Sequence, residues 1–457
     1  MSEGKLAVIV LAAGQGTRMK SAMPKVLHPV AGRPMVAHLL ATVAELRPER
    51  VVVVVGPGME AVSAAVAPHA TVVQEERLGT GHAVGCAREP LGDFDGDVLV
   101  LYGDTPLIRV ETLRRLLAER RAAPHPAVVV LGFVPAGGGE YGRLVIGRAG
   151  LEAIVEHRDA TPEQRATLSL CNSGVMAIDG PRLFGLVDRL RNANAKGEYY
   201  LTDIVALARG DGLLCGWVDG EEEELLGINS RAELARAEAV AQSRLREAAM
   251  EGGATLVDPA TVWFTHDTRV GRDVTIHPNV VFGPRVTVGD GVVINGFCHI
   301  TEAVIEDGAI IGPFARLRPG AVIGAGAHIG NFVEVKKATV EAGAKVNHLT
   351  YVGDARVGAG ANVGAGTITC NYDGFGKHFT DIGPGAFVGS NTSLVAPVSV
   401  GAGAVIGAGS VITKDVAPGA LAVARGAQME LPGWAERFRA KRQAAKEARR
   451  KDGEGKD

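Results

Sequence analysis

The first half of the chain alternates short apolar runs with helical patterns. Segments Met35–Leu46 and Val110–Arg121 carry apolar residues at three- and four-residue spacing, as amphipathic helices do. Four other runs are almost continuously apolar, as expected of strands buried on both faces: Leu6–Leu11, Val51–Val55, Val98–Tyr102 and Val128–Phe133. This alternation over residues 1–228 predicts an α/β layer with a mostly parallel sheet.

A helical segment follows at Asn229. Ser230 and Glu233 fit a capping box, and the next residues are almost all strong helix formers. Twenty such residues would make a rod of about 30 Å. Because Gly252 and Gly253 close the segment, we expect a rigid helical spacer over residues 230–252.

From Val270 the sequence repeats about every six residues, with an aliphatic or aromatic residue first and often glycine second. A hexad of this kind is typical of a parallel β-helix, in which each unit is a short strand plus a turn and three units close one coil. The inward positions are expected to be Val270, Ile276, Phe282, Val288, Ile294, Ile300, Ile305, Ile311, Leu317, Ile323, Ile329, Val335, Val340, Val346, Val352, Val357, Val363, Ile382, Val388, Leu394, Val400, Ile406 and Ile412.

The repeat is interrupted after Ile368. The next inward residue, Ile382, follows 14 positions later instead of six, so about eight residues are surplus. Excursions from a solenoid often carry function. The surplus stretch TCNYDGFGKHF is therefore a candidate for part of a binding site.

Composition narrows the class of protein. A length of 457 residues favours two or three domains, and 48 Lys+Arg against 51 Asp+Glu gives a net charge of −3, which does not favour nucleic-acid binding. A local exception is the basic tail at residues 437–457. The five scattered cysteines predict buried free thiols, and no early apolar run reaches the roughly 20 residues of a membrane span, so we expect a cytoplasmic protein.

A glycine-rich loop, LAAGQGTRM, follows the first predicted strand. A dinucleotide fingerprint would need glycine at position 19, which is methionine, and a P-loop would need Gly-Lys-Ser/Thr. Backbone N–H groups along the loop, with Arg18 and nearby Lys25, suit the oxygens of a nucleoside triphosphate. A plain turn is the alternative.

Another candidate is Asp104, which ends the predicted strand Val98–Tyr102. Open α/β sheets bind ligands at the carboxyl edge of their strands. Beside a triphosphate, this carboxylate would hold Mg²⁺, an ion that prefers oxygen ligands. A helix-capping aspartate before Val110 is the alternative.

These motifs are long enough to carry a resemblance. LAAGQGTRM and PKVLH resemble the sugar-1-phosphate nucleotidyltransferases. With LGTGHA, YGDTPL, VEHRDAT and the repeats, residues 5–432 resemble the bacterial bifunctional N-acetylglucosamine-1-phosphate uridyltransferases/glucosamine-1-phosphate N-acetyltransferases. The resemblance implies a Rossmann-like uridyltransferase domain over 1–229, a linker helix over 230–252, and a left-handed β-helical acetyltransferase domain with its basic tail over 253–457.

The resemblance also implies roles in the first half. Arg18 and Lys25 would neutralise phosphate charge, and Asp104 and Asn229 would ligate Mg²⁺. The residues expected to hold the uridine nucleotide are Leu11, Ala12, Ala13, Gly14, Gln74, Gly79 and Thr80. Those expected to hold N-acetylglucosamine 1-phosphate are Tyr102, Gly103, Gly142, Glu156, Asn172 and Asn229.

In the second half, charged and aromatic residues exceed what a bare β-helix needs. A lone His348 would usually be a solvated turn residue, but acetyl transfer to an amine needs a base, and the resemblance assigns this role to His348, with Glu334 as an orienting carboxylate. The resemblance assigns glucosamine 1-phosphate to Arg318, Lys336, Tyr351, Asn362, Asn371 and Tyr372. It assigns acetyl-coenzyme A to Ala365, Ser390, Ala408 and Arg425.

The implied enzyme acetylates glucosamine 1-phosphate from acetyl-coenzyme A, then transfers uridylyl from UTP, yielding UDP-N-acetylglucosamine for the cell envelope. We expect a homotrimer with small-molecule substrates and with neither nucleic acid nor membrane as partner. The basic tail is either a solvated helix or a contributor to coenzyme A binding. The alternatives are a nucleotidyltransferase whose β-helix is only structural or regulatory, and a sugar-nucleotide sensor without turnover.

Overall fold

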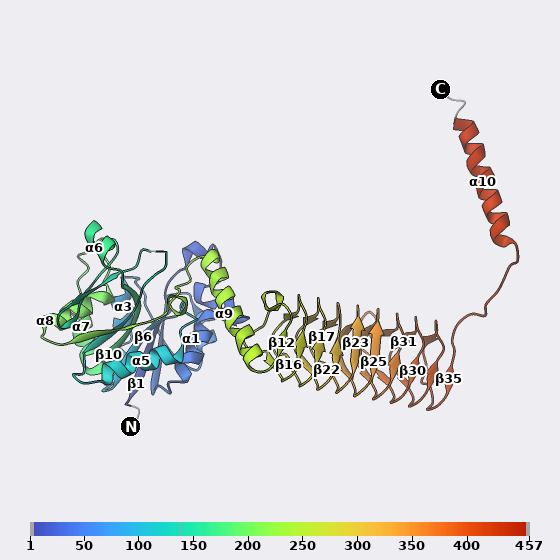
Figure 1. Cartoon of the computed structure of the whole chain (residues 1–457), viewed down its shortest axis with the longest axis horizontal. Coiled ribbons are helices and arrows are strands. Elements are labelled where there is room, and N and C mark those ends of the chain that lie inside the picture. Colours follow the sequence, from blue (N-terminus) through green and yellow to red (C-terminus); the bar gives the residue numbers. More distant parts are fainter. Residues whose placement is uncertain (1–3, 138, 454–457) are drawn as a thin grey trace. The chain divides into compact units, whose positions relative to one another are not determined.

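The computed structural model describes residues 4–137 and 139–453, with side chains as far as residue 448. Its contacts divide the chain into two compact units that meet in sequence between Thr287 and Val288. Figure 1 colours both along the sequence, the first from blue to yellow-green and the second towards red.

Unit 1 is built on a nine-stranded sheet of order β11-β7-β10-β6-β1-β4-β5, to which β8 and β9 are added beside β10. Its central strand β1 pairs in parallel with β4 and β6. The strands are β1 (Leu6–Leu11), β4 (Arg50–Val55), β5 (Ala70–Val73), β6 (Asp97–Tyr102), β7 (Val128–Phe133), β8 (Arg143–Gly147), β9 (Gly150–Val155), β10 (Cys171–Asp179) and β11 (Cys215–Asp219).

The sheet is mostly parallel, as the sequence predicts, because β11–β7, β6–β1, β1–β4 and β4–β5 all pair in parallel, but it also contains antiparallel strands. Strand β10 runs antiparallel between β6 and β7, and β8 and β9 form an antiparallel pair. The apolar strands predicted from the sequence nevertheless form the core, because their side chains enter the two clusters that line opposite faces of the sheet. A buried strand is apolar in either direction, so its composition does not disclose its orientation.

Helices cover both faces of this sheet. They are α1 (Met35–Ala44), α2 (Glu60–Val66), α3 (Thr80–Gly85), α4 (Arg88–Leu91), α5 (Val110–Arg121), α6 (Pro162–Thr167), α7 (Gly180–Val187) and α8 (Ile204–Gly210). Helix α6 is the exception, because none of its residues is buried. Short 3-10 helices occur at η1 (Thr17–Met19), η2 (Lys25–Leu27), η3 (Leu201–Asp203), η4 (Glu222–Glu224) and η5 (Pro259–Thr261), and β2 (Pro29–Val30) pairs with β3 (Arg33–Pro34).

The expected spacer is helix α9 (Arg231–Glu251), which Ser230 caps by accepting a hydrogen bond from the Glu233 amide. It does not stand free. Ala237 and Ala241 enter an apolar cluster with Val30 and Ile228, which precede the helix in unit 1. Unit 1 then continues into the first β-helical strands, β12 (Thr255–Leu256), β13 (Arg269–Val270), β14 (Thr275–Ile276) and β15 (Val281–Phe282), while β16 (Thr287–Val288) spans the boundary.

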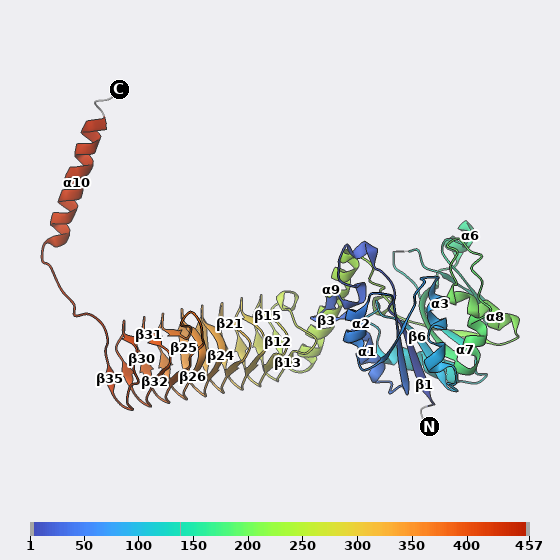
Figure 2. The same cartoon turned by 180° about the vertical axis from the view of Figure 1, so that it is seen from behind.

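Unit 2 is a parallel β-helix whose short strands stack as successive coils (Figure 1, Figure 2). One ladder passes through β17, β20, β23, β25, β27, β30, β33 and β35. Its inward residues, such as Ile294, Ile311 and Ile329, are aligned in register and fully buried. The hexad pattern therefore identified the core of this unit.

All strands from β17 onward belong to unit 2. The strands are β17 (Val293–Ile294), β18 (His299–Ile300), β19 (Ala303–Ile305), β20 (Ile310–Ile311), β21 (Arg316–Leu317), β22 (Ala321–Ile323), β23 (His328–Asn331), β24 (Glu334–Val340), β25 (Lys345–His348), β26 (Tyr351–Val357), β27 (Asn362–Val363), β28 (Ile368–Cys370), β29 (Thr380–Ile382), β30 (Phe387–Val388), β31 (Ser393–Val395), β32 (Val398–Val400), β33 (Val405–Ile406), β34 (Val411–Ile412) and β35 (Leu421–Ala422). Helix α10 (Trp434–Gly453) follows them, and its described side chains are exposed.

The surplus residues form a hairpin-like excursion between β28 and β29, where Tyr372 bridges antiparallel to Lys377. The five cysteines are free, as expected, but only three are buried, because Cys86 and Cys370 are partly exposed. Among the described residues, no helix is long and apolar enough to cross a membrane.

Candidate active sites

The predicted phosphate loop and the predicted metal ligand lie at one edge of the unit 1 sheet. Strands β1 and β6 pair in register, with Leu11 opposite Tyr102, so the loop after β1 and the Gly103-Asp104 dipeptide leave the sheet together. Strands β4 and β6 flank β1 on opposite sides. The chain segments that follow neighbouring strands therefore leave the sheet in opposite directions, and a crevice forms between them, as in other open α/β sheets.

A cavity of about 260 Å³ occupies this crevice. The residues predicted to hold the nucleotide line it, together with Arg77 and Glu198, which the motifs do not single out. The predicted residues in its wall are Leu11, Ala12, Ala13, Gly14, Lys25, Gln74, Gly79, Thr80, Tyr102 and Asp104. The sequence motifs therefore converge on one pocket.

Gln74 shapes the wall opposite the loop. It is 4% exposed, and its amide donates to the carbonyl of Gly79 at 3.0 Å. Gly79 has φ +110°, and a Cβ there would lie 2.6 Å from the Tyr199 carbonyl oxygen, so only glycine fits. Thr80 follows at the start of α3 and accepts a hydrogen bond from the Leu201 amide at 3.0 Å.

Lys25 joins the two predicted metal ligands. Its ammonium is hydrogen-bonded to the Asp104 carboxylate and, at 3.0 Å, to the side-chain oxygen of Asn229. The Lys25 side chain is only 10% exposed and that of Asp104 is 17% exposed. The ion pair is therefore shielded from water, where charge interactions are strong.

Backbone contacts hold these ligands together. The Ile228 amide donates to the Asp104 carbonyl at 3.0 Å, and the Asn229 amide donates to the Glu233 carboxylate at 2.7 Å. Glu233 also accepts from the Ser230 hydroxyl at 3.1 Å. The carboxylate expected to close a capping box therefore holds the preceding residue, Asn229, instead.

The donor chemistry of this site fits Mg²⁺. The oxygens of Asp104 and Asn229 converge on one cationic group, the Lys25 ammonium. Within residues 4–137 and 139–453, no group of three or more His, Cys, Asp or Glu side chains could hold a metal. Two protein oxygens with substrate phosphates and water are the usual surroundings of Mg²⁺.

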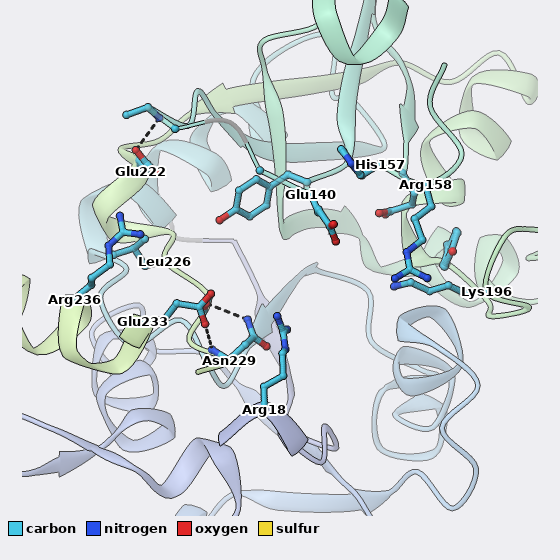
Figure 3. A pocket seen from close by; sticks show the side chains of 17 residues that line it. Arg18, Glu140, His157, Arg158, Lys196, Glu222, Leu226, Asn229, Glu233 and Arg236 are labelled. Carbon is cyan, nitrogen blue, oxygen red and sulfur yellow. Dashed lines mark hydrogen bonds between the residues drawn. The ribbon is translucent and has the colours of Figure 1, made fainter. Parts of the chain in front are cut away.

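A larger cavity of about 840 Å³ contains Arg18, Glu156 and Asn229 from the predicted set (Figure 3). Figure 3 also shows Glu233 and Arg236 of α9 among its lining side chains, with Glu233 bonded to Asn229. Arg158 and Lys196 add positive charge to the same cavity. The sequence motifs assign none of these last four residues a role in the site. Glu233 is expected only to cap α9, and Arg158 lies in VEHRDAT without an assigned contact. Arg236 and Lys196 belong to no motif.

Gly142, Glu156 and Asn172 come together although they are far apart in sequence. The Asn172 amide donates to the Gly142 carbonyl at 2.8 Å, and a Cβ on Gly142 would lie 3.5 Å from both Glu156 carboxylate oxygens. Burial raises the pKa of the Glu156 carboxyl, while a hydrogen bond from the Thr202 hydroxyl at 3.1 Å opposes this. The result is a compact polar wall.

The Tyr102 ring packs against Gly174, a residue that the sequence motifs do not identify. Gly174 has φ +90°, and a Cβ there would lie 2.5 Å from the Tyr102 ring. Burial raises the pKa of Tyr102, and the nearby Asp104 and Glu156 carboxylates add to the effect. The Tyr102 hydroxyl therefore stays protonated near neutral pH. The Asn172 side chain accepts from the Gly174 amide at 2.9 Å and fixes this contact.

In unit 2, His348 is exposed and lies opposite Asn331 in the β23–β25 ladder. Its Nδ1 lies 2.6 Å from the Asn331 side-chain oxygen. Within the chain, Glu334 does not contact His348, because it pairs with Arg318 at 2.6 Å and with Arg316 at 3.9 Å. Glu334 belongs to a different ladder from His348, and residue spacing alone did not separate the two.

The residues predicted to contact acetyl-coenzyme A form a column with His348. Backbone hydrogen bonds join successive coils there: Gly366 N donates to the His348 carbonyl, Asn391 N to the Ala365 carbonyl and Gly409 N to the Ser390 carbonyl. The Arg425 guanidinium donates to the Ala408 carbonyl at 2.6 Å. The column thus runs through His348, Ala365, Ser390, Ala408 and Arg425.

Only some of the residues predicted to grip glucosamine 1-phosphate lie on neighbouring strands, namely Lys336 on β24 and Tyr351 on β26. Tyr351 pairs in register with Glu334, and Lys336 with Gly353, one coil further on. Asn371 is 4% exposed and donates to Asp354 at 2.5 Å and to the Tyr351 hydroxyl at 3.5 Å. Asn362 is in the β25–β27 ladder, and Tyr372 is exposed in the excursion.

Sequence comparisons agree with this architecture. The model of the MobA-like NTP transferase domain matches residues 8–169. The model of the bacterial transferase hexapeptide, which spans six repeats, matches residues 267–302, 302–337 and 379–414. The fold and sites thus define a nucleotidyltransferase joined to a left-handed β-helical transferase of the hexapeptide class.

Relatives cover the whole arrangement. The chain is 73% identical to the bifunctional protein GlmU of Paramagnetospirillum magneticum over 98% of this chain and 100% of the relative. It is 67% identical to that of Rhodospirillum rubrum over 95% and 98%, and 58% identical to that of Azorhizobium caulinodans over 97% and 99%. The chain belongs to the GlmU family of bifunctional proteins.

Membership of the GlmU family decides between the three functions that the sequence analysis left open. The chain is a bifunctional transferase with uridyltransferase and acetyltransferase activities, and it acts on nucleotide and acyl substrates. A β-helix that is only structural or regulatory is not favoured, and neither is a sensor without turnover.

The contact between Gly174 and Tyr102 generates a test. Gly174→Ala should lower kcat/KM for uridylyl transfer about tenfold or more, because the new methyl group must displace the Tyr102 ring and the backbone has positive φ. Gly185→Ala is the matched control, since nothing lies within 4 Å of its Cβ position. Steady-state assays of pyrophosphate and thiol release should show loss of the first activity alone; an unchanged kcat/KM would contradict the assigned role of this contact.

Proposed function

We propose that the two candidate sites carry out consecutive reactions. Unit 2 acetylates the amine of glucosamine 1-phosphate from acetyl-coenzyme A, and unit 1 joins the resulting N-acetylglucosamine 1-phosphate to UMP from UTP. The observation that carries the proposal is the meeting of Lys25, Asp104 and Asn229 between the two cavities of unit 1.

In uridylyl transfer, a phosphate oxygen of the sugar phosphate attacks the α-phosphorus of UTP and pyrophosphate leaves. The cavity of about 260 Å³ would hold the nucleotide, with Gln74, Gly79 and Thr80 on its base side. The larger cavity would hold the sugar phosphate against Glu156 and the Gly142–Asn172 wall. Such a reaction depends mainly on alignment and on stabilisation of phosphate charge.

We assign Asp104 and Asn229 as the protein ligands of Mg²⁺, which when bound neutralises phosphate charge and aligns the oxygens of the nucleotide. The Lys25 ammonium is hydrogen-bonded to both residues. When substrate binds, this ammonium would exchange them for phosphate oxygens. Arg18 lines the larger cavity and not the nucleotide cavity, so it would supply a second positive charge to phosphate oxygens from the side of the sugar phosphate. These roles require positioned groups rather than covalent chemistry.

For acetyl transfer, His348 would take a proton from the amine while the nitrogen attacks the acetyl carbonyl. The carbon–sulfur bond then breaks, coenzyme A leaves as its thiolate, and the proton held by His348 passes to the sulfur to give the thiol. The contact with Asn331 fixes the His348 ring, so the other ring nitrogen, Nε2, is available for the amine. Arg318 and Lys336 would hold the sugar phosphate, assisted by Tyr351, Asn362, Asn371 and Tyr372. Ala365, Ser390, Ala408 and Arg425 would contact acetyl-coenzyme A along the column.

A homotrimer would complete this second site. Phe297, Phe314 and Phe332 stack on successive coils with ring centroids 4.9 and 5.1 Å apart, and each remains about half exposed. Phe332 directly follows Asn331, the partner of His348. An exposed aromatic column beside an exposed base favours a contact between copies, and closed threefold symmetry suits stacked coils. Free thiols and the proposed co-substrates favour the cytoplasm as the place of action.

Removing the carboxylate charge at the metal site should separate the activities. Asp104→Asn should lower uridylyl transfer about a hundredfold or more, because a neutral amide binds Mg²⁺ and Lys25 less well. Acetyl transfer should stay near normal. Asp95→Asn, which removes an exposed carboxylate paired with Lys5, is the control. Uridylyl transfer that persists in EDTA would refute the metal assignment.

His348→Ala should have the opposite effect. Thiol release from acetyl-coenzyme A should fall about 10²–10⁴-fold, the usual range for a lost general base. Pyrophosphate release should persist because unit 1 is unaltered. His299→Ala, an exposed histidine elsewhere on the β-helix, is the matched control. Loss of both activities in a folded variant, or of neither, excludes the assignment.

Subunit mixing tests whether the acetyl-transfer site is shared. His348→Ala subunits and subunits truncated after Gly426, each inactive alone, would be denatured and refolded together in equal amounts. If one chain supplies His348 and another the tail, about one site in four should recover, since each half is intact with probability about one half. No recovery in trimers confirmed by sedimentation would show that each tail serves its own chain.

A further inference from the structure

Three elements of unit 1 meet where helix α9 passes the turn between β2 and β3 and the first β-helical coil. The turn consists of Ala31 and Gly32, and the coil contributes residues 263–266. This junction lies within one compact unit, because unit 1 extends to Thr287. The first coil is thus built into the nucleotidyltransferase part rather than merely attached to it.

Gln242 is the centre of this junction. It is 1% exposed although it lies on a helix whose other polar side chains are mostly exposed or partly exposed. Its amide nitrogen donates to the Phe264 carbonyl at 2.7 Å and to Glu238 at 2.9 Å, while its oxygen accepts from the Phe264 amide at 2.9 Å. The Gln242 side chain therefore hydrogen-bonds both the backbone N–H and the backbone carbonyl of Phe264 in the first coil.

Glu238 extends the junction to the β2–β3 turn. Its carboxylate accepts from the Ala31 amide at 2.7 Å, and the carbonyl of Ala31 accepts from the His266 amide at 2.9 Å. The adjacent Gly32 has φ +77°, and a Cβ there would lie 2.9 Å from a methyl carbon of Thr265. The turn is therefore held by α9 on one side and by the first coil on the other.

Apolar packing and polar contacts together hold α9. Ala237 and Ala241 are buried, and Leu234, Val240 and Leu245 pack partly buried against the same apolar cluster. Apolar packing does not fix the sliding position of a helix as sharply as directed hydrogen bonds do, so Gln242 and Glu238 set its register. Arg231 adds a polar contact near the site, since its guanidinium donates to the Met19 carbonyl at 3.2 Å.

Both ends of the junction lead to the uridylyl-transfer site. Asn229 immediately precedes the cap of α9, 13 positions before Gln242, or about 20 Å along a helix. Lys25 lies in η2, which directly precedes the β2–β3 turn. A shift of α9 relative to the turn would separate Asn229 from Lys25, and misplacement of reacting groups by about 1 Å is enough to slow a reaction strongly.

We propose that Gln242 and Glu238 are positioning residues of the uridylyl-transfer site, which fix α9 to the first β-helical coil and to the β2–β3 turn and so hold Asn229 and Lys25 together. This role rests on the proposed function, in which Asn229 ligates Mg²⁺. The first β-helical coil would then serve the uridylyl-transfer site, although the sequence analysis places residues 253–457 in the acetyltransferase domain.

The experiment compares full-length Gln242→Leu and Glu238→Ala with the parent chain. Ser243→Leu, at the exposed next position of α9, is the matched control. Pyrophosphate release would be measured across a Mg²⁺ titration, and amide hydrogen exchange would be followed at residues 25–32 and 228–234. We expect the half-maximal Mg²⁺ concentration to rise about fivefold or more and kcat to fall about tenfold in both variants. Exchange should quicken in both stretches, while thiol release stays unchanged.

A merely structural role would give a different result. Partial unfolding would lower kcat with the active fraction but leave the Mg²⁺ dependence of the remaining enzyme unchanged, and that outcome would overturn the proposal. Asn229→Ala separates the two claims. If it leaves the Mg²⁺ dependence unchanged, the metal assignment fails; if it shifts that dependence while neither junction variant does, only the positioning role fails. Should Gln242→Leu not fold, Glu238→Ala decides alone.

Discussion

The contact of the Lys25 ammonium with Asp104 and Asn229 is the interaction on which the uridylyl-transfer site depends. These residues come from three distant stretches of chain: the segment after the glycine-rich loop, the end of β6 and the start of α9. Little water reaches the Lys25 and Asp104 side chains, so their attraction is strong. The same oxygen atoms that hold the lysine have the chemistry to hold Mg²⁺.

The two halves of the protein form their sites differently. Unit 1 encloses cavities at a sheet edge, where Gly79 and Gly174 admit close backbone and ring contacts. Unit 2 sets residues along successive coils, and His348 remains exposed on the single chain. A sheet edge can surround a ligand alone, whereas a convex solenoid offers only part of a wall. This difference is why we propose that copies of the chain share the second site.

The sequence predicts most of the fold because the periodic signals are strong. Strand Val128–Phe133 and helix Val110–Arg121 occur with the predicted bounds. The antiparallel direction of β10 was not predictable, since a buried strand has the same composition in either direction. Likewise, the motifs brought together the nucleotide-pocket residues but not Gln242 or Asn331. Nothing local distinguishes a buried glutamine in a polar helix, and the partner of His348 depends on which positions share a coil ladder.

A direct test is to locate the metal. Crystals of the full chain grown with Mn²⁺ and UDP-N-acetylglucosamine would be measured at a wavelength where Mn²⁺ scatters anomalously. The account predicts one anomalous peak in unit 1 at coordination distance, about 2.1 Å, from an Asp104 carboxylate oxygen and the Asn229 side-chain oxygen, with Lys25 turned towards phosphate. A fully occupied peak that contacts neither residue would contradict it.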